Sequence, residues 1–507
     1  MSEVYWFNHA ALPLLALLQL VPVIGAAWVW RLARDNPARP ASVRLGRVFA
    51  LLELGLAIAL YRGIDTSTAV LQFAEWLPLV GPIAYHAAAD GVTVLFVLLV
   101  ALLVLLLVIY SLVRELPNAG RLLAVMLALE GVLMSQLVTV NLFWFVASSA
   151  AEIALVGYLL WFWATSPEKD VMLARFYQFQ GTGIALLLLG TLVLGWSHAH
   201  ATGEWSFDLL DLTRVPVEAR VAPIVFFMLF YGLGVRTPIF PLHGWLPVVA
   251  QHGNVAIAPV FLLGIKIGIF GLLRYVLPIL PEMVVEWHLF VVGFAAAGVF
   301  YAALLAFQQS DLRRLLAFAV ISHTGLLIMG IFALHPMGFQ GGVLLTVNFG
   351  LAVTAMWMMT GFVYRRTHTT ILARLGGLFD RIPLIGITFL VGGLAIVGMP
   401  GTPGFDAAHL VLEASIERFG ALPTVAAALG NVAAAGFLLY AFQRAFLAAR
   451  DQALDREVER ASREELWVVG VMMTVLLVAG FYLEPWLRLV EAPLQGLASH
   501  FVGVKGL

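Results

Sequence analysis

Long runs of apolar residues recur along the whole chain, and they constrain its fold more than any other feature. Each run is about 20 residues long, the length that an α-helix needs to cross the hydrocarbon core of a bilayer. Only 12% of the 507 residues are charged, about half the share found in a soluble globular protein. The short alternating segments typical of a transmembrane β-barrel do not occur. The sequence therefore predicts an all-α polytopic membrane protein.

We expect fourteen apolar segments to form transmembrane helices, joined by loops too short to hold a soluble domain. The segments cover residues 11–30, 45–62, 91–113, 120–139, 140–164, 179–197, 222–245, 255–279, 287–307, 315–334, 342–364, 383–410, 421–443 and 467–487.

The distribution of lysine and arginine supports fourteen segments and predicts their orientation. Of these 29 residues, 20 lie in loops that follow odd-numbered segments, and seven lie in even-numbered loops or the C-terminal tail. The other two, Arg236 and Lys266, lie within segments. Because cytoplasmic loops are rich in lysine and arginine, we expect both termini on the non-cytoplasmic side of a bacterial inner membrane.

Two segments contain pairs of prolines that a continuous helix would not tolerate cheaply. Pro238 and Pro241 lie in the seventh segment, and Pro400 and Pro403 lie in the twelfth. Paired interruptions indicate an inverted-repeat transporter with its site near the middle of the membrane. Two unrelated kinks are the alternative.

On the first interpretation, the chain consists of three N-terminal helices, two inverted five-helix repeats and a C-terminal helix with its tail. These parts cover residues 1–114, 115–282, 283–450 and 451–507, respectively.

Charged residues inside the apolar segments are the best candidates for a functional site, because charge at membrane depth is costly and marks ion pathways. Lys266 lies in the eighth segment without a charged neighbour in the sequence. Lysine is the cation whose pKa changes readily on burial, so proton transfer explains this choice. Glu152 in the fifth segment is expected to pair with either Arg236 or Lys266. Arg236 is always charged and would act on its neighbours, or it would anchor the carbonyls of the broken helix.

Other ionisable residues along the segments extend this candidate proton pathway. Glu130 is a candidate partner in the fourth segment, whereas Glu53 in the second is interpreted as a packing or interface carboxyl. His243, in the first break, is interpreted as a cap or bridge for the backbone. Histidine titrates in the physiological range, which adds further candidates. The pathway candidates besides Lys266, Glu152, Arg236 and Glu130 are His252, His323, His409 and Asp406.

The chain contains no cysteine, so it cannot supply thiolate ligands for an iron–sulfur cluster. No residue spacing indicates a metal site, a nucleophile–base pair or a phosphate-binding glycine loop. We therefore expect no cofactor and no redox chemistry in this chain, and we leave open whether it is part of an enzyme.

Several sequence blocks resemble the antiporter-like subunits of respiratory complex I, Mrp-type sodium/proton antiporters and membrane-bound hydrogenases. The resemblance extends from about residue 90 to 450, with fourteen helices as in one complex I member. The blocks that carry it are residues 241–247, 271–275, 305–318, 322–325, 375–378 and 398–402.

The resemblance implies two inverted repeats, each a proton half-channel with a broken helix. It also implies that Lys266 is the central lysine and that His323 is the histidine of the second half-channel. Three positions depart from the family pattern. The lysine expected on the seventh helix is Arg236, the glutamate expected on the fifth falls on Ala151, one position before Glu152, and the acid or lysine expected after the second break falls on Ala408.

These departures leave His409 or Asp406 as substitutes after the second break, and they suggest a specialised branch. One such branch serves the DAB-type inorganic-carbon accumulation complexes, in which an antiporter-like subunit works with a soluble protein resembling a zinc carbonic anhydrase.

Three functions follow from this interpretation. The first is a proton-conducting subunit that couples proton flux to the activity of a partner. Energy-coupled uptake of CO2 or bicarbonate is one such activity. The second is the pump arm of an NADH:quinone oxidoreductase or a hydrogenase-type complex. The third is a membrane scaffold that does not conduct. We favour the first, with other membrane subunits, a soluble protein or both as partners.

Overall fold

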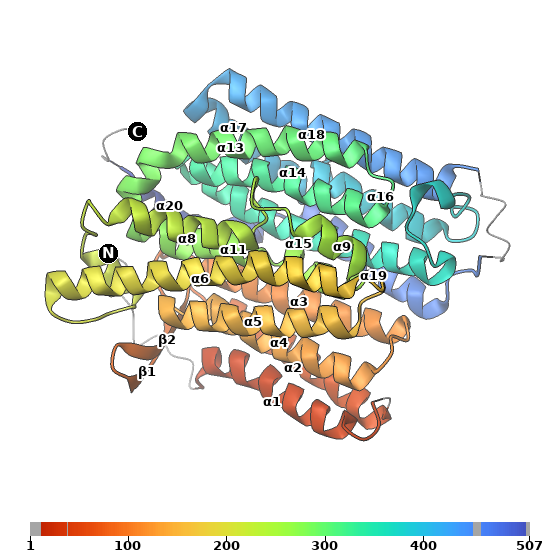
Figure 1. Ribbon diagram of the computed structural model, residues 1–507, viewed down its shortest axis with the longest axis horizontal. Coiled ribbons are helices and arrows are strands. Elements are labelled where there is room, and N and C mark those ends of the chain that lie inside the picture. Colours follow the sequence, from red (N-terminus) through yellow and green to blue (C-terminus); the bar gives the residue numbers. More distant parts are fainter. Residues whose placement is uncertain (1–11, 38, 450–457, 503–507) are drawn as a thin grey trace.

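The computed structural model describes residues 12–37, 39–449 and 458–502. Long helices run side by side through this part of the chain and form a single bundle (Figure 1). Helices occupy all fourteen predicted segments, so the predicted helical membrane architecture is confirmed. The predicted orientation, which rests on the lysine and arginine of the loops, stays a prediction, and the termini lie outside the described residues.

The first six predicted segments form uninterrupted helices. They are α1 (Leu14–Ala33), α2 (Pro40–Gly63), α3 (Gly91–Val113), α4 (Ala119–Val138), α5 (Leu142–Phe162) and α6 (Lys169–Thr202). α1 packs closely along α4, and α2 lies against α1, α3 and α4. α3 is buried on nearly all sides, which explains why its sequence is apolar all round rather than amphipathic.

Five further helices form the second half of the bundle. They are α13 (Pro281–Phe307), α14 (Leu312–Phe332), α15 (Pro336–Thr367), α18 (Ala421–Phe442) and α19 (Arg463–Phe481). α14 and α15 are almost completely buried, and they form the centre of the bundle. α1 and α2 lie at one edge in Figure 1, and α18 lies at the opposite edge.

The proline pairs interrupt the seventh and twelfth segments as predicted, and the eighth segment is also irregular. The seventh consists of α8 (Ala222–Arg236) and α9 (Leu246–His252), and the twelfth consists of α16 (Pro383–Val397) and α17 (Gly404–Phe419). The eighth consists of α10 (Ile257–Pro259), η1 (Val260–Gly264), α11 (Ile267–Gly271), η2 (Leu272–Val276) and α12 (Leu277–Ile279). The boundaries of the two proposed repeats stay a prediction.

Two elements that the sequence did not predict cover one end of the bundle (Figure 1). One is an antiparallel hairpin of β1 (Gln72–Val80) and β2 (Ile83–Ala89). The other is α20 (Glu484–Ser499), which packs its apolar face along α3 and α15. The short helix α7 (Leu209–Arg214) lies at the same end.

The hairpin joins several helix ends at this side of the bundle. The Glu75 carboxylate accepts hydrogen bonds from the backbone N–H groups of Leu15 and Ala16, at 2.8 and 2.9 Å. These groups have no partner inside α1, so Glu75 caps that helix from another element. The His86 ring is paired with Asp208, and the His86 carbonyl accepts from the Val140 N–H at 3.0 Å.

Glycines allow several helices to approach closely, as small residues do in membrane bundles. At the contact between α6 and α8, a methyl group placed on Gly232 would come within 2.8 Å of the Gly183 carbonyl oxygen and within 2.5 Å of the Leu187 side chain. By contrast, Gly181 on α6 has no atom within 4 Å of the same position.

We expect Gly232→Ala to destabilise the protein, because the added methyl group forces α6 and α8 apart. Overpacking of this kind costs about 1–3 kcal/mol. The matched control, Gly181→Ala, should be neutral or slightly stabilising, because alanine favours the helix. Thermal unfolding of both purified variants in detergent measures the difference. Equal unfolding temperatures would show that the α6–α8 contact is not tight.

Candidate functional site

The first cluster of polar residues lies between α4, α5 and α8. The Arg236 guanidinium is paired with the Glu152 carboxylate, and both residues are 5% exposed. Gln136 contacts both, because its amide donates to Glu152 at 2.8 Å and its oxygen accepts from Arg236 at 3.1 Å. The Ser149 hydroxyl donates to the same Gln136 oxygen at 3.1 Å. Of the two partners predicted for Glu152, the structure thus shows Arg236.

The break in the seventh segment positions Arg236. α8 ends at this residue, and Pro238 follows two residues later, where its ring prevents the helix from continuing. The backbone carbonyls at the end of α8 find other donors. The Trp245 indole donates to the Val235 carbonyl at 3.1 Å, and the Ile239 N–H donates to the Gly234 carbonyl at 3.0 Å.

Lys266 lies at the centre of the bundle and is 1% exposed. Its backbone adopts a left-handed conformation, with φ 45°, between η1 and α11. This conformation is costly for a residue other than glycine and is typical of functional sites. The Lys266 Nζ donates to the Thr324 hydroxyl at 2.8 Å and lies 5.1 Å from the centre of the Phe349 ring. Within the described residues no acidic side chain pairs with it.

His323 lies next to Thr324 on α14 and is 2% exposed. Its Nδ1 lies 3.1 Å from the Ala319 carbonyl oxygen, and its Nε2 lies 3.0 Å from the Asn431 side-chain oxygen. The Asn431 amide donates to the Val397 carbonyl at 2.6 Å, which sets its orientation. Both ring nitrogens of His323 therefore face acceptors, an arrangement that can hold an imidazolium.

Phe349 connects the central lysine with His323. Its ring lies below the Lys266 ammonium group, and its centre is 5.2 Å from that of the His323 ring in an edge-on arrangement. On the other side, α11 lies directly against the end of α8, since a methyl group on Gly268 would come within 2.1 Å of the Thr237 hydroxyl. The pair of Glu152 and Arg236, the central Lys266 and His323 thus follow one another through the middle of the bundle. We call this series of groups the row.

The second break presents backbone groups close to His323. α16 ends at Val397, and α17 begins at Gly404. Pro400 lies between the two helices, and Pro403 is the residue directly before α17. The Asn348 amide donates to the Ala395 carbonyl at 2.9 Å, as Asn431 does to that of Val397. Two asparagines from α15 and α18 therefore satisfy carbonyls at the end of α16.

The structure places other candidates away from this row of polar groups. His252 lies at the end of α9, where its Nδ1 is 2.9 Å from the Ser166 hydroxyl. Asp406 is exposed, and the His409 side chain is 73% exposed, with its Nε2 3.8 Å from Glu413. His243 is buried in the first break and stacks against Phe240.

Glu130 is fully buried on α4 but faces α2 and Glu53 rather than the row.

Sequence reasoning missed several residues that contact the predicted ones. Three of them are amide side chains inside apolar helices: Gln136, Asn348 and Asn431. A polar amide in an apolar segment is uncommon, so the sequence could have identified these three as candidates. Thr324 is an ordinary helix residue, and Phe349 is one of 34 phenylalanines, so neither stands out in the sequence.

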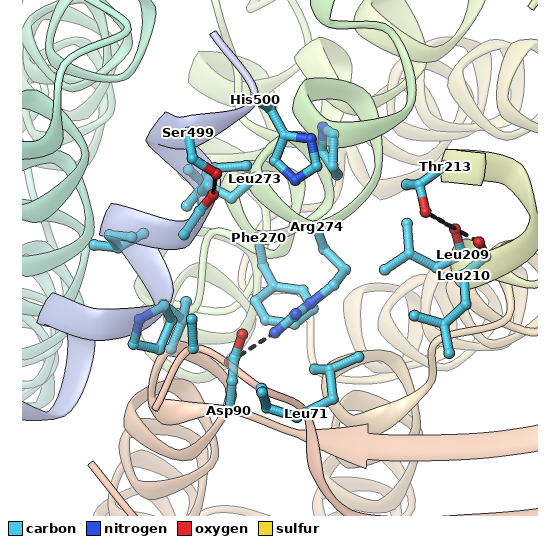
Figure 2. A pocket seen from close by; sticks show the side chains of 18 of the residues that line it. Leu71, Asp90, Leu209, Leu210, Thr213, Phe270, Leu273, Arg274, Ser499 and His500 are labelled. Carbon is cyan, nitrogen blue, oxygen red and sulfur yellow. Dashed lines mark hydrogen bonds and ion pairs between the residues drawn. The ribbon is translucent and has the colours of Figure 1, made fainter. Parts of the chain in front are cut away.

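A cavity of about 520 Å³ lies at the end of the bundle that carries the hairpin. Figure 2 shows Arg274 beside Asp90 on its wall, with His500 across the opening. Arg274 donates to Asp90 at 2.8 Å and to the Thr93 hydroxyl at 2.7 Å. Since Asp90 also caps α3 by accepting from the Thr93 N–H, this pair anchors the segment that carries Lys266 to the start of α3.

Comparison with known proteins identifies the class to which this arrangement belongs. Residues 150–434 match the family described as NADH:quinone oxidoreductase/Mrp antiporter, transmembrane. The match covers more than half of the chain, and the chain therefore belongs to this family. It is a multi-pass membrane protein with the antiporter-like fold.

Similar proteins extend the comparison over almost the whole chain. NADH-quinone oxidoreductase subunit M of Escherichia coli strain K12 is 27% identical, over 96% of this chain and 98% of that protein. F(420)H(2) dehydrogenase subunit M of Methanosarcina mazei is also 27% identical, over 97% and 99%.

Solved structures agree with these relatives. One chain of respiratory complex I from Thermus thermophilus is 26% identical, with a TM-score of 0.86 over 96% of this chain and 99% of that one. A chain of the Mrp complex from Dietzia sp. DQ12-45-1b has the same TM-score at 16% identity, over 97% and 99%, and supports the fold alone.

We expect Arg236→Met to destabilise the protein strongly, because it leaves the Glu152 carboxylate buried without its cation. Removing one partner of a buried pair costs about 3–5 kcal/mol. The double variant Arg236→Met/Glu152→Met should recover most of the loss, because neither charge is then left alone. Thermal unfolding in detergent measures both.

Arg488→Met is the control for this test. Arg488 pairs with Glu484 on the exposed face of α20, and exposed pairs contribute little. If Arg236→Met unfolded at the same temperature as Arg488→Met, the buried pair would not stabilise the fold.

Proposed function

We propose that this chain is a proton-translocating membrane subunit of a larger complex. The observation that carries the proposal is the burial of Lys266 at the centre of the bundle, where its ammonium group contacts the Thr324 hydroxyl and the Phe349 ring and pairs with no acidic side chain of the described residues. An ammonium group without a counter-charge is costly to bury, whereas the neutral amine is not. A lysine in this position can therefore exchange a proton with groups on either side.

The neighbouring clusters supply a route to and from this lysine. On one side, Glu152 is an acid–base group paired with Arg236, and Arg236 itself cannot release a proton. On the other side, His323 is held between the Ala319 carbonyl and Asn431. The broken helices lie next to both clusters, and irregular backbone inside a membrane bundle is typical of a binding site or a water-filled path.

Similar proteins support a role within a complex. The relatives are named as subunits of an NADH-quinone oxidoreductase and an F(420)H(2) dehydrogenase. We propose that this chain likewise works beside other membrane subunits in a bacterial inner membrane. There the row of polar groups would couple proton movement across the membrane to the activity of a partner.

A second candidate function is energy-coupled uptake of inorganic carbon with a soluble partner that resembles a zinc carbonic anhydrase. Three departures from the family pattern, at Ala151, Arg236 and Ala408, support it, because a subunit of a respiratory complex is expected to keep those positions. The pairing of Arg236 with Glu152 shows how two of these departures can fit together.

We expect Lys266→Ala to abolish proton translocation by the assembled complex in proteoliposomes that contain a pH-sensitive dye. Lys266→Arg should fail as well, because a guanidinium keeps its proton while preserving the positive charge. Lys169→Ala, at the start of α6, is the control and should translocate normally. Undiminished translocation by either Lys266 variant would contradict the proposed function and favour a scaffold that does not conduct.

Purification in a mild detergent distinguishes the two candidate functions. For the main proposal we expect further membrane subunits to co-purify with the chain, together with flavin and iron–sulfur proteins if the complex carries out electron transfer. A zinc-bearing soluble protein without redox subunits would instead support inorganic-carbon uptake. Isolation of the chain without any other subunit would contradict both.

A further inference from the structure

Two glutamates lie inside the N-terminal part of the bundle, away from the row of groups around Lys266. Glu53 lies near the middle of α2, and Glu130 lies near the middle of α4. Both side chains are 0% exposed. Both also lie outside residues 150–434, the part of the chain that matches the family.

The two glutamates lie on helices that pack against one another, α2 and α4. All four carboxyl oxygens are buried and have no hydrogen-bond partner among the described residues. In the same part of the chain, neither carboxyl belongs to an ion pair. No ionisable side chain on the surrounding elements forms a hydrogen bond with either carboxyl. These side chains are Arg31, Arg44, Arg47, Tyr61, Arg62, Tyr85, His86, Tyr110, Arg121, Glu152 and Tyr158.

Tight helix packing closes the space around the pair. A methyl group on Gly131, the residue after Glu130, would come within 2.9 Å of the Gln19 carbonyl oxygen on α1. A methyl group on Gly46 of α2 would come within 3.0 Å of the Leu123 side chain on α4. The three helices therefore pack tightly around both glutamates, and two ionised carboxylates are too costly to bury so close to each other without a cation.

We propose that Glu53 and Glu130 form a proton-binding site, in which the pair holds at least one exchangeable proton. The proton neutralises negative charge that no described side chain compensates by an ion pair or a hydrogen bond. α4 connects this site with the row, because Gln136, six residues after Glu130, contacts both Glu152 and Arg236. The role of the pair in translocation rests on the proposed function, but proton binding itself does not.

Infrared difference spectroscopy of the full-length protein in detergent tests proton binding directly. A protonated carboxyl has a C=O stretching band that a carboxylate lacks, and this band shifts in D2O if the proton exchanges. We expect the wild type at neutral pH to show such a band, and we expect Glu53→Gln/Glu130→Gln to lose it. Glu484→Gln, which removes an exposed carboxylate, should leave the band unchanged.

Two further measurements keep the test decisive if an amide disturbs the packing. Glu53→Leu/Glu130→Leu places apolar side chains in the same space and should lose the same band. Replacing potassium by sodium in the buffer should change nothing. The proposal is overturned if wild type and both double variants have identical spectra, if the band does not shift in D2O, or if sodium alters the carboxylate bands of the pair.

The Lys266→Ala variant separates this proposal from the proposed function. We expect Lys266→Ala to lose translocation and to keep the infrared band, whereas the double glutamine variant should lose the band and translocate more slowly. If Lys266→Ala translocated normally, the proposed function would fail while the spectra still decided the proton-binding site. If the spectra were identical, the glutamate site would fail while the role of Lys266 stood.

Discussion

The architecture depends on one requirement: backbone groups freed by a broken helix inside a membrane bundle must find partners within the protein. At the first break, Trp245 donates to the Val235 carbonyl of α8, and at the second, Asn431 donates to the Val397 carbonyl of α16. Asn431 also faces His323. The residue that satisfies the break thus positions an ionisable group of the candidate pathway.

Much of the fold could be predicted because its strongest signals are local. Apolar runs of membrane length mark the fourteen segments, and proline prevents a helix from continuing wherever it occurs in the middle of one. The hairpin of β1 and β2 had no comparable signal, since Pro78 interrupts its first strand and alanines dominate its second. α20 is short and amphipathic, so its position depends on the groove between α3 and α15 rather than on its own composition.

The candidate site was predictable only in part, because a sequence shows which residues are charged but not how helices are rotated about their axes. Charge inside an apolar segment identified Lys266, Glu152 and Arg236. The choice of Arg236 as the partner of Glu152 required knowing where the end of α8 lies relative to α5 in the bundle. The rotation of α17 also makes the His409 side chain point outward. In the sequence, His409 is only one residue away from the position after the second break at which the family pattern expects an acid or a lysine.

The hairpin has a mechanical consequence for the half of the bundle that carries Glu152. Glu75 holds the start of α1, the His86 carbonyl holds the junction of α4 and α5, and the His86 ring holds the residue before α7. These chain segments are therefore clamped together at one end and cannot slide past one another there. Any displacement that accompanies a change of charge at Glu152 must be taken up at the unclamped end, or in the breaks that separate α8 from α9 and divide the segment of Lys266.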